Sequence, residues 1–377
     1  MGRAVRLFLC MPHLRFAVPA VLSVLSACAS HSGHPGPAAT QEAPRPHAAE
    51  PARVTAETEY VAQTERQPSE APPAPPPEAS ATKPAEVRCG DDGAPYDAAA
   101  LRDRVRSLAS PELDGRASGS PGDLAARAGL TERFRCLGLV PAGADGSYEQ
   151  PFTADGHATA NLVGYLPGDD AAVGNDIILV GAHHDHLGDG HLGANDNASG
   201  AAALLAIAQA IRQRGKPHRT IAFALFGGEE LGLYGSAYFA AHPPAPLPID
   251  RIVYDINLDM VGSYRQAGAV YAMGTFRGLA GTAIVKALAA DHPALHVGVG
   301  GRGVGSDHEA FCQAGVPYVF FWTPDKRCYH KRCDTIDQLD AAHLSEIAAF
   351  AGELTERLSD SPGNLASART RLGCTGR

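Results

Sequence analysis

The pattern of apolar and polar positions divides the chain into an apolar N-terminal stretch, a polar segment and a long remainder with regular spacing. In the remainder, segments such as 97–109 and 121–137 carry apolar residues three and four positions apart, which is typical of amphipathic helices. The helices that we predict cover residues 97–109, 121–137, 201–211, 233–241, 279–290 and 341–358.

Short apolar runs alternate with these helices. Ile177–Val180 is a continuous apolar run that ends before Gly181, as expected for a strand buried on both faces. The strands that we predict cover residues 161–166, 177–180, 220–226, 251–258, 269–273 and 316–321. Strands that alternate with helices predict an α/β fold, here a three-layer sandwich with a central, largely parallel mixed sheet flanked by helices. Ligands of such folds gather at the carboxyl ends of the strands.

The N-terminal stretch has the pattern of a secretory signal over residues 1–27. Three arginines precede the apolar run Phe16–Leu25, which is short for a membrane-spanning helix. The run ends in Leu25-Ser26-Ala27-Cys28, which resembles the lipobox of bacterial lipoproteins. This resemblance implies that Cys28 is lipidated and that the protein is exported and membrane-anchored, in the outer membrane if the source has one. An ordinary signal peptide cleaved nearby, giving a secreted protein, is the alternative.

Residues 28–88 form the polar segment. Residues 29–88 contain no Leu, Ile or Phe and one aromatic residue, Tyr60, among many Pro, Ala and Glu. Such a composition cannot bury enough apolar surface to offset the entropy of ordering, so we expect a disordered tether. The composition becomes globular near Cys89, and we expect one domain over 89–377. The net charge of −9 argues against a general nucleic-acid binder.

Acidic and imidazole residues follow several of the predicted strands. Ala182–His186 follows the strand 177–180, Gly227–Glu230 follows 220–226, and Asp259 ends 251–258. Gly193–Asn197 leads into a helix, and Cys328–His330 follows the last strand. Histidine, aspartate and glutamate are ligands of zinc, and two such ions can share a carboxylate and a water. A catalytic base must lie beside that water without binding the metal.

Six motifs occur in an order and spread that resemble a known family. They are Ala-His-His-Asp (182–185), Ala-Asn-Asp-Asn-Ala-Ser-Gly (194–200), Gly-Glu-Glu (228–230), Asn-Leu-Asp-Met-Val-Gly (257–262), Ser-Asp-His (306–308) and Cys-Tyr-His-Lys-Arg-Cys-Asp (328–334). Together they resemble the bacterial leucyl aminopeptidase and aminopeptidase S family of co-catalytic di-zinc exopeptidases. The resemblance covers most of residues 100–358.

This resemblance implies two zinc ions with five protein ligands. His183, Asp196 and Asp259 are expected to bind one ion. Asp196, Glu230 and His330 are expected to bind the other, so that Asp196 bridges the two.

The resemblance also implies the roles of the remaining site residues. Glu229 would be the general base, and Tyr329 would donate to the oxyanion of the tetrahedral intermediate. Asp185 would orient the metal-bound His183, because histidine ligands usually need such a partner. Asp307 and His308 would lie next to the metal ligands without binding metal themselves.

Two further expectations concern the backbone. In the family the bond after the bridging aspartate is often cis, here Asp196–Asn197. Larger members carry an inserted protease-associated domain, but eight residues separate Phe152 from Asn161, so we expect no insert in this chain.

Several residues near the site have simpler interpretations. We interpret His184, His186 and His191 as solvated histidines of a glycine-rich loop. His308 is an alternative ligand in place of His330. Gly298–Gly305 lacks the ending of a phosphate-binding loop, and we expect a flexible loop that lines the site there.

The cysteines outside the signal segment fit an exported protein. We expect a disulfide between Cys328 and Cys333 that holds the His330 loop, although both could instead bind metal. Cys312 is most simply a buried apolar residue. The sequence does not assign partners to Cys89, Cys136, Cys312 or Cys374.

The function that we predict is that of a zinc aminopeptidase acting on peptides or small proteins with a free N-terminus. A carboxypeptidase of the same fold is an alternative, for which Arg302 could bind the terminal carboxylate. A glutaminyl cyclase uses one zinc, whereas all five ligand positions are present here. A non-catalytic binding module would lack ligands, and none of the expected ligands is missing.

Overall fold

The computed structural model describes residue 89 and residues 93–275, 281–303 and 305–368. The expected signal segment, Cys28 and the tether lie outside these residues. The helices are α1 (Ala98–Leu108), α2 (Pro121–Cys136), α3 (Gly200–Arg214), α4 (Tyr234–Ala241), α5 (Tyr264–Ala267), α6 (Thr282–Asp291), α7 (His308–Gln313) and α8 (Ala341–Asp360). The strands are β1 (Val140–Pro141), β2 (Glu149–Ala154), β3 (His157–Leu166), β4 (Ile177–His183), β5 (Thr220–Phe226), β6 (Ile252–Leu258), β7 (Val270–Met273), β8 (Val297–Val299) and β9 (Tyr318–Trp322).

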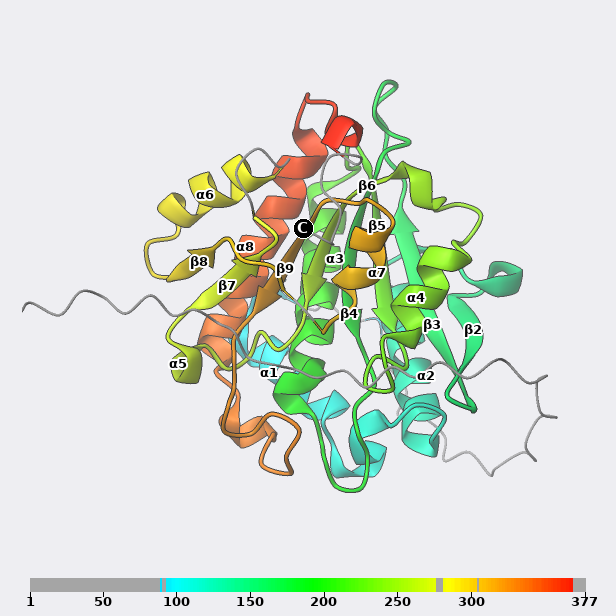
Figure 1. Cartoon of the computed structure of the whole chain (residues 1–377), viewed down its shortest axis with the longest axis vertical. Coiled ribbons are helices and arrows are strands. Elements are labelled where there is room, and N and C mark those ends of the chain that lie inside the picture. Colours follow the sequence, from blue (N-terminus) through cyan, green and yellow to red (C-terminus); the bar gives the residue numbers. More distant parts are fainter. Residues whose placement is uncertain (1–88, 90–92, 276–280, 304, 369–377) are drawn as a thin grey trace, which may run out of the picture. The chain divides into compact units, whose positions relative to one another are not determined.

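One mixed sheet contains all nine strands. Its order is β1-β3-β5-β4-β6-β9-β7-β8, with β2 paired to β3 (Figure 1). The central strands β5, β4, β6 and β9 are parallel, whereas β3 and β7 join this centre in antiparallel pairs. The carboxyl ends of the central strands therefore lie at the same edge of the sheet, as the sequence predicts.

Alternate side chains of the central strands enter two different cores. Ile178 and Val180 of β4 belong to the core with α1, α3 and α8, while Ile177 and Leu179 belong to the core with Phe239 of α4 and Phe311 of α7. Successive side chains of a strand point to opposite faces, so each core lies on its own face of the sheet. This arrangement confirms the three-layer sandwich.

The ends of the helices next to the sheet have defined partners. The side chain of Asp97 accepts a hydrogen bond from Ala100 N at the start of α1, and Ser120 does the same for α2. At the start of α3, a Cβ on Gly200 would lie 2.2 Å from Leu258 O. Gly200 therefore lets α3 approach the end of β6, where Asp259 follows.

Covalent cross-links fasten two parts of this domain. Disulfides join Cys89 to Cys136 and Cys328 to Cys333, and the second is the pair that we predicted. Cys312 is buried but is also disulfide-bonded, so its interpretation as a simple apolar residue is wrong. Within the described ranges, no helix has the length and apolarity needed to cross a bilayer.

Candidate metal centre

The candidate ligands come from the ends of four neighbouring strands and one turn. His183 is the last residue of β4, Glu230 follows β5, Asp259 follows β6, and His330 lies in the loop after β9. Asp196 lies in the turn Ala194–Ser199 that leads into α3. The topology of the sheet thus brings all five together.

Asn197 connects the turn of Asp196 to the loop of Asp259. Its Nδ2 donates to Leu258 O at 2.9 Å, and its Oδ1 accepts from Met260 N at 3.2 Å and from Gly200 N at 2.9 Å. The peptide bond between Asp196 and Asn197 is cis, as the resemblance implied. These contacts fix two candidate ligands relative to each other.

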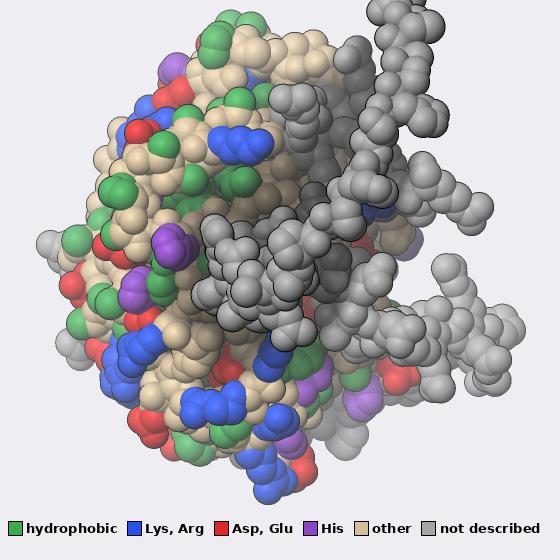
Figure 2. Space-filling model, turned by 60° about the vertical axis from the view of Figure 1, so that its left-hand side comes forward, with side chains coloured by type: hydrophobic (Ala, Val, Ile, Leu, Met, Phe, Trp, Pro, Cys, Tyr) green, Lys and Arg blue, Asp and Glu red, His purple; other side chains and the backbone are tan. Residues whose placement is uncertain are grey.

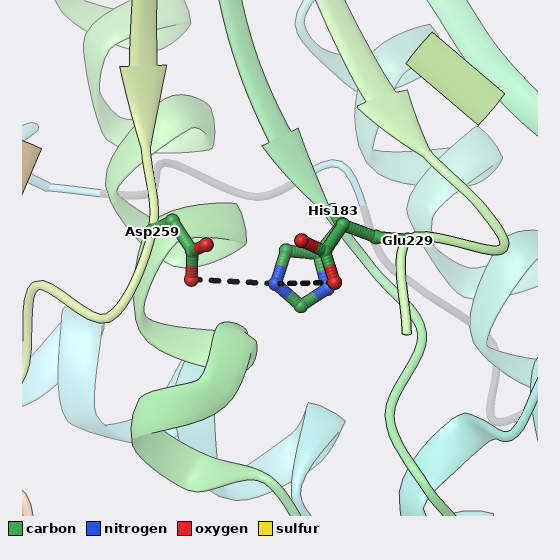
Figure 3. Close-up of side chains that lie close together, drawn as sticks. All are labelled: His183, Glu229 and Asp259. Atoms are coloured by element: carbon green, nitrogen blue, oxygen red, sulfur yellow. Dashed lines mark hydrogen bonds and ion pairs between the residues drawn. The ribbon is translucent and has the colours of Figure 1, made fainter. Parts of the chain in front are cut away.

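The first group of candidate ligands surrounds His183. Its Nε2 lies 3.3 Å from Asp196 Oδ1 and 3.3 Å from Asp259 Oδ1. Ligand atoms about 2.0–2.2 Å from a tetrahedral zinc are about 3.3–3.6 Å apart, so the spacing fits a shared ion. Figure 3 shows Asp259 and Glu229 reaching His183 from different strand ends. Glu229 Oε2 is farther away, at 4.0 Å from His183 Nε2.

The second group surrounds His330. Its Nε2 lies 3.0 Å from Glu230 Oε2 and 3.3 Å from Asp196 Oδ2. Asp196 therefore contributes one oxygen to each group, which is the geometry of a bridging carboxylate. Its Oδ2 is buried, and none of its neighbours in the described ranges meets it with full hydrogen-bond geometry, so such an atom calls for a further partner. The residues present thus fit two divalent ions.

Donor proximity alone does not separate ligands from the base. In the described part of the chain, two sets of three residues have donor atoms within 4.8 Å of one another: His183 with Glu229 and Asp259, and His183 with Asp196 and Glu230. We favour Asp196 over Glu229 beside Asp259, because the Asp196 oxygen is nearer to His183 Nε2.

The carboxylates of the site favour a positive charge at its centre. Burial alone would lower the pKa of His183, but the carboxylates of Glu229 and Asp259 raise it well above its usual value. Burial acts in the same direction at His330, yet Asp196 and Glu230 raise the pKa of His330 to about 10. In the protein without metal, imidazolium groups would supply the cationic charge that the carboxylates require.

Asp185 contacts both His183 and the segment of Glu229. Its carbonyl oxygen lies 3.1 Å from His183 Nδ1, whereas its carboxylate is 3.7 Å from that atom. The carboxylate accepts from Glu229 N at 3.2 Å and from the Ser118 hydroxyl at 2.9 Å. Ser118 Oγ in turn accepts from Gly228 N at 2.9 Å. Asp185 therefore orients His183 through its backbone and Glu229 through its side chain.

The other predicted site residues lie around this centre. Asp307 is fully buried, and burial raises the pKa of its carboxyl to about 7, with Asp259 adding to the effect. The ring of His308 lies between Tyr318 and Phe320, at centroid distances of 4.7 and 4.6 Å. Burial lowers the pKa of His308 to about 4, and contact with the backbone of Gly303 opposes this shift without cancelling it. His308 is therefore not one of the clustered donors.

Tyr329 lies beside a candidate ligand at the surface of the site. Its ring stacks on the ring of His330 with a centroid distance of 3.8 Å. The side chain remains 43 % exposed, so a bound substrate could reach it. Burial and the nearby carboxylates of Asp196 and Glu230 raise the pKa of the Tyr329 hydroxyl, which keeps it protonated as a donor.

Two histidines that we interpreted as solvated are buried. His184 and His186 are each 1 % exposed. His184 Nε2 lies 3.1 Å from Ala160 O, and His186 Nδ1 lies 2.6 Å from Glu230 Oε1. The interpretation is wrong because both rings lie in the protein interior, where each has a polar partner. His191 is half-buried, with Nδ1 2.9 Å from Gly188 O.

Sequence reasoning missed two charged residues that support the ligand loops. Arg116 is fully buried and donates to His184 O at 2.7 Å and Gly193 O at 3.1 Å. The carboxylate of Asp334 accepts from Asn195 N at 2.8 Å and from Asp196 N at 2.9 Å. Asp334 lies inside one of the six motifs, so a signal existed for it, but Arg116 lies in none of them.

The sequence of this chain matches a known protein family. The sequence profile described as "Peptidase family M28" matches residues 161–355, just over half of the chain. The chain belongs to peptidase family M28. The matched range contains all five candidate ligands and Glu229, and it begins in β3 and ends in α8.

Curated proteins with similar sequences include leupeptin-inactivating enzyme 1 of Streptomyces exfoliatus, 32% identical over 54% of this chain and 50% of the relative. Aminopeptidase YwaD of Bacillus subtilis is 31% identical over 48% of this chain and 39% of the relative. This M28 chain thus spans half or less of the length of these two relatives.

Solved structures confirm the fold. A zinc aminopeptidase from Bacillus subtilis, BSAP, matches with a TM-score of 0.61, 17% identity, and coverage of 73% of this chain and 98% of that chain. Porphyromonas gingivalis glutaminyl cyclase matches with a TM-score of 0.57, 18% identity, and coverage of 70% and 99%. At these identities the likeness concerns the fold of the M28 domain and not its reaction.

Proposed function

We propose that this protein is a di-zinc aminopeptidase that removes N-terminal residues from peptides. The observation that carries the proposal is the division of the two Asp196 oxygens between the His183 group and the His330 group. The names of the aminopeptidase relative YwaD and of the matched zinc aminopeptidase support the choice of reaction. His183, Asp196 and Asp259 would hold one ion, and Asp196, Glu230 and His330 the other.

Zinc bound there would polarise the scissile carbonyl and increase the acidity of the attacking water. Glu229 is the general base in this proposal, because its carboxylate faces the site at a greater distance from His183 than the proposed ligands do. Burial raises the pKa of Glu229 well above its usual value, which favours accepting a proton and then releasing it to the leaving amine. Tyr329 would donate to the oxygen that becomes negative during attack.

Two matched variants test the roles of the neighbouring glutamates. Glu229→Gln keeps the shape of the side chain but removes the base, so kcat should fall by about 10²–10⁴ with metal content unchanged. Glu230→Gln should lower the occupancy of one ion, because a neutral amide is a poorer ligand than a carboxylate. Loss of metal from Glu229→Gln with full occupancy in Glu230→Gln would reverse the assignment. Full activity of both variants would place the site elsewhere.

The substrate class requires its own experiment. The protein with measured zinc content would be assayed on amino-acid p-nitroanilides, on the same compounds with blocked N-termini, and on peptides with free C-termini. Cleavage that needs a free N-terminus supports the proposal. Release of C-terminal residues would favour a carboxypeptidase, and cyclisation of N-terminal glutamine would favour a glutaminyl cyclase.

The same proposal places the enzyme outside the cytoplasm, tethered through a lipid on Cys28. The lipobox-like ending of the apolar run supports this placement, and the disulfides Cys89–Cys136 and Cys328–Cys333 are compatible with export. Mass spectrometry of the mature N-terminus tests it. A diacylated Cys28 is the expected result, and an unmodified N-terminus at another residue would contradict it.

A further inference from the structure

We propose that His186 is a positioning residue that holds Glu230 ready for the second metal ion, an inference that rests on the ligand assignment above. The two oxygens of Glu230 have different partners. Oε2 lies 3.0 Å from His330 Nε2, and Oε1 lies 2.6 Å from His186 Nδ1. One oxygen is thus left for the ion, while the other is held by an imidazole.

The distances distinguish a hydrogen bond from a shared ion. Two atoms that each lie about 2.1 Å from one zinc but are only 2.6 Å apart would subtend about 75–80°, far below the tetrahedral angle. His186 Nδ1 is also 3.9 Å from Asp196 Oδ2, whereas His330 Nε2 is 3.3 Å from that atom. His330 therefore has the position of a ligand, and His186 has that of a donor to a ligand.

The surroundings of His186 leave its ring little freedom. The side chain is 1 % exposed, and its ring lies edge-on to the ring of His330 at a centroid distance of 6.0 Å. A Cβ on Gly193 would lie 2.6 Å from Cγ of His186 and 2.7 Å from Cδ2. Gly193, at φ 62°, thus permits the close approach of its backbone to the imidazole. A rigid donor of this kind fixes the orientation of a ligand before the ion arrives.

The test is a stepwise titration of the metal-free protein with Co²⁺, in which each ion is followed by its absorption spectrum and by competition with a chelator. His186→Leu should bind the first ion normally and the second about 10–100-fold more weakly, the usual cost of losing an outer partner of a ligand. His184→Leu removes a buried neighbour that contacts Ala160 O instead of Glu230, and it should bind both ions as the unmodified protein does.

Two polar variants keep the inference testable if His186→Leu does not fold. In His186→Asn the side-chain amide nitrogen occupies the place of the histidine Nδ1, so this variant should retain the second ion. In His186→Gln the amide nitrogen lies nearer the place of Nε2, so this variant should lose the second ion. Equal second-ion affinity in His186→Leu or His186→Gln and in the unmodified protein overturns the inference. Loss in His186→Asn would also overturn it, in favour of direct ligation. Failure of the unmodified protein to bind two ions would instead refute the ligand assignment.

Discussion

Replacing Arg116 by Met should lower the free energy of unfolding of the domain and also weaken metal binding. The guanidinium donates to four carbonyl oxygens: Leu108 at 2.5 Å, His184 at 2.7 Å, Leu192 at 2.9 Å and Gly193 at 3.1 Å. Hydrogen bonds of charged groups contribute about 1.5–3 kcal/mol each, and they are not additive. We therefore expect the free energy of unfolding to fall by about 4–6 kcal/mol, a large part of the usual 5–15 kcal/mol.

The effect on metal follows from where those carbonyls lie. His184, Leu192 and Gly193 belong to the segment that joins the candidate ligands His183 and Asp196. Without Arg116, this segment loses the group that fixes its path, so the affinity for both ions should fall about tenfold or more. Arg116→Lys, which keeps the charge but not the planar donor set, should show a smaller loss of both properties.

Arg219 provides a matched control for this prediction. It is also fully buried and donates to four carbonyl oxygens, those of Leu358, Ser359, Ser361 and Gly363, at the end of α8. Arg219→Met should lower the urea midpoint to a similar extent and leave metal affinity unchanged. Equal metal affinity in folded Arg116→Met, Arg219→Met and the unmodified protein would refute the reasoning.

Two further predictions concern pH and the disulfides. In the protein stripped of metal with a chelator, the urea midpoint should fall between about pH 6.5 and 8.5. The carboxylates of Asp196 and Glu230 raise the pKa of His330 from 6.5 to about 10, so protonated His330 favours the folded state and this advantage is lost as the pH rises through that interval. Burial raises the pKa of the Asp307 carboxyl from 3.8 to about 7, so Asp307 adds to the fall only up to about that pH. A rising midpoint would contradict this. The double variant of Cys328 and Cys333 to Ser should weaken the second ion more than the first, because this disulfide encloses Tyr329 and His330. Its control is the double Ser variant of Cys89 and Cys136, a pair 47 residues apart, which should cost about 4 kcal/mol of stability without changing metal affinity.

The strands of the sheet centre could be predicted because they are buried on both faces. The continuous apolar run at 177–180 and the run of strand-favouring residues at 220–226 became β4 and β5, and the second of these has the predicted bounds. By contrast, β2 contains Glu149, Gln150 and Pro151, and β8 contains a glycine, so neither has the pattern of a buried strand. Strands at a sheet edge are stabilised by pairing with β3 or β7 more than by their own residues.

The ligands of the candidate site could be predicted because each follows an element with a clear pattern. The support around them could not, since it depends on close approaches between segments distant in sequence. Nothing in the sequence near His186 indicates that Gly193 folds onto its ring, and so a solvated histidine was the simpler interpretation. The role of Arg116 could not be predicted for a similar reason. Its acceptors are backbone carbonyl oxygens, which every residue type has, so the sequence does not reveal them.

The strand order of the sheet also sets the time at which metal can enter during folding. His183 and His330 are far apart in sequence, and the strands that carry them, β4 and β9, are separated in the sheet by β6. Contacts of such long range form late because closing long loops is costly in entropy. The five donors can therefore converge only after β5, β4, β6 and β9 have paired. A bound ion would then stabilise a sheet that has already formed. The amino-acid sequence must therefore direct the assembly of that sheet without the help of the metal.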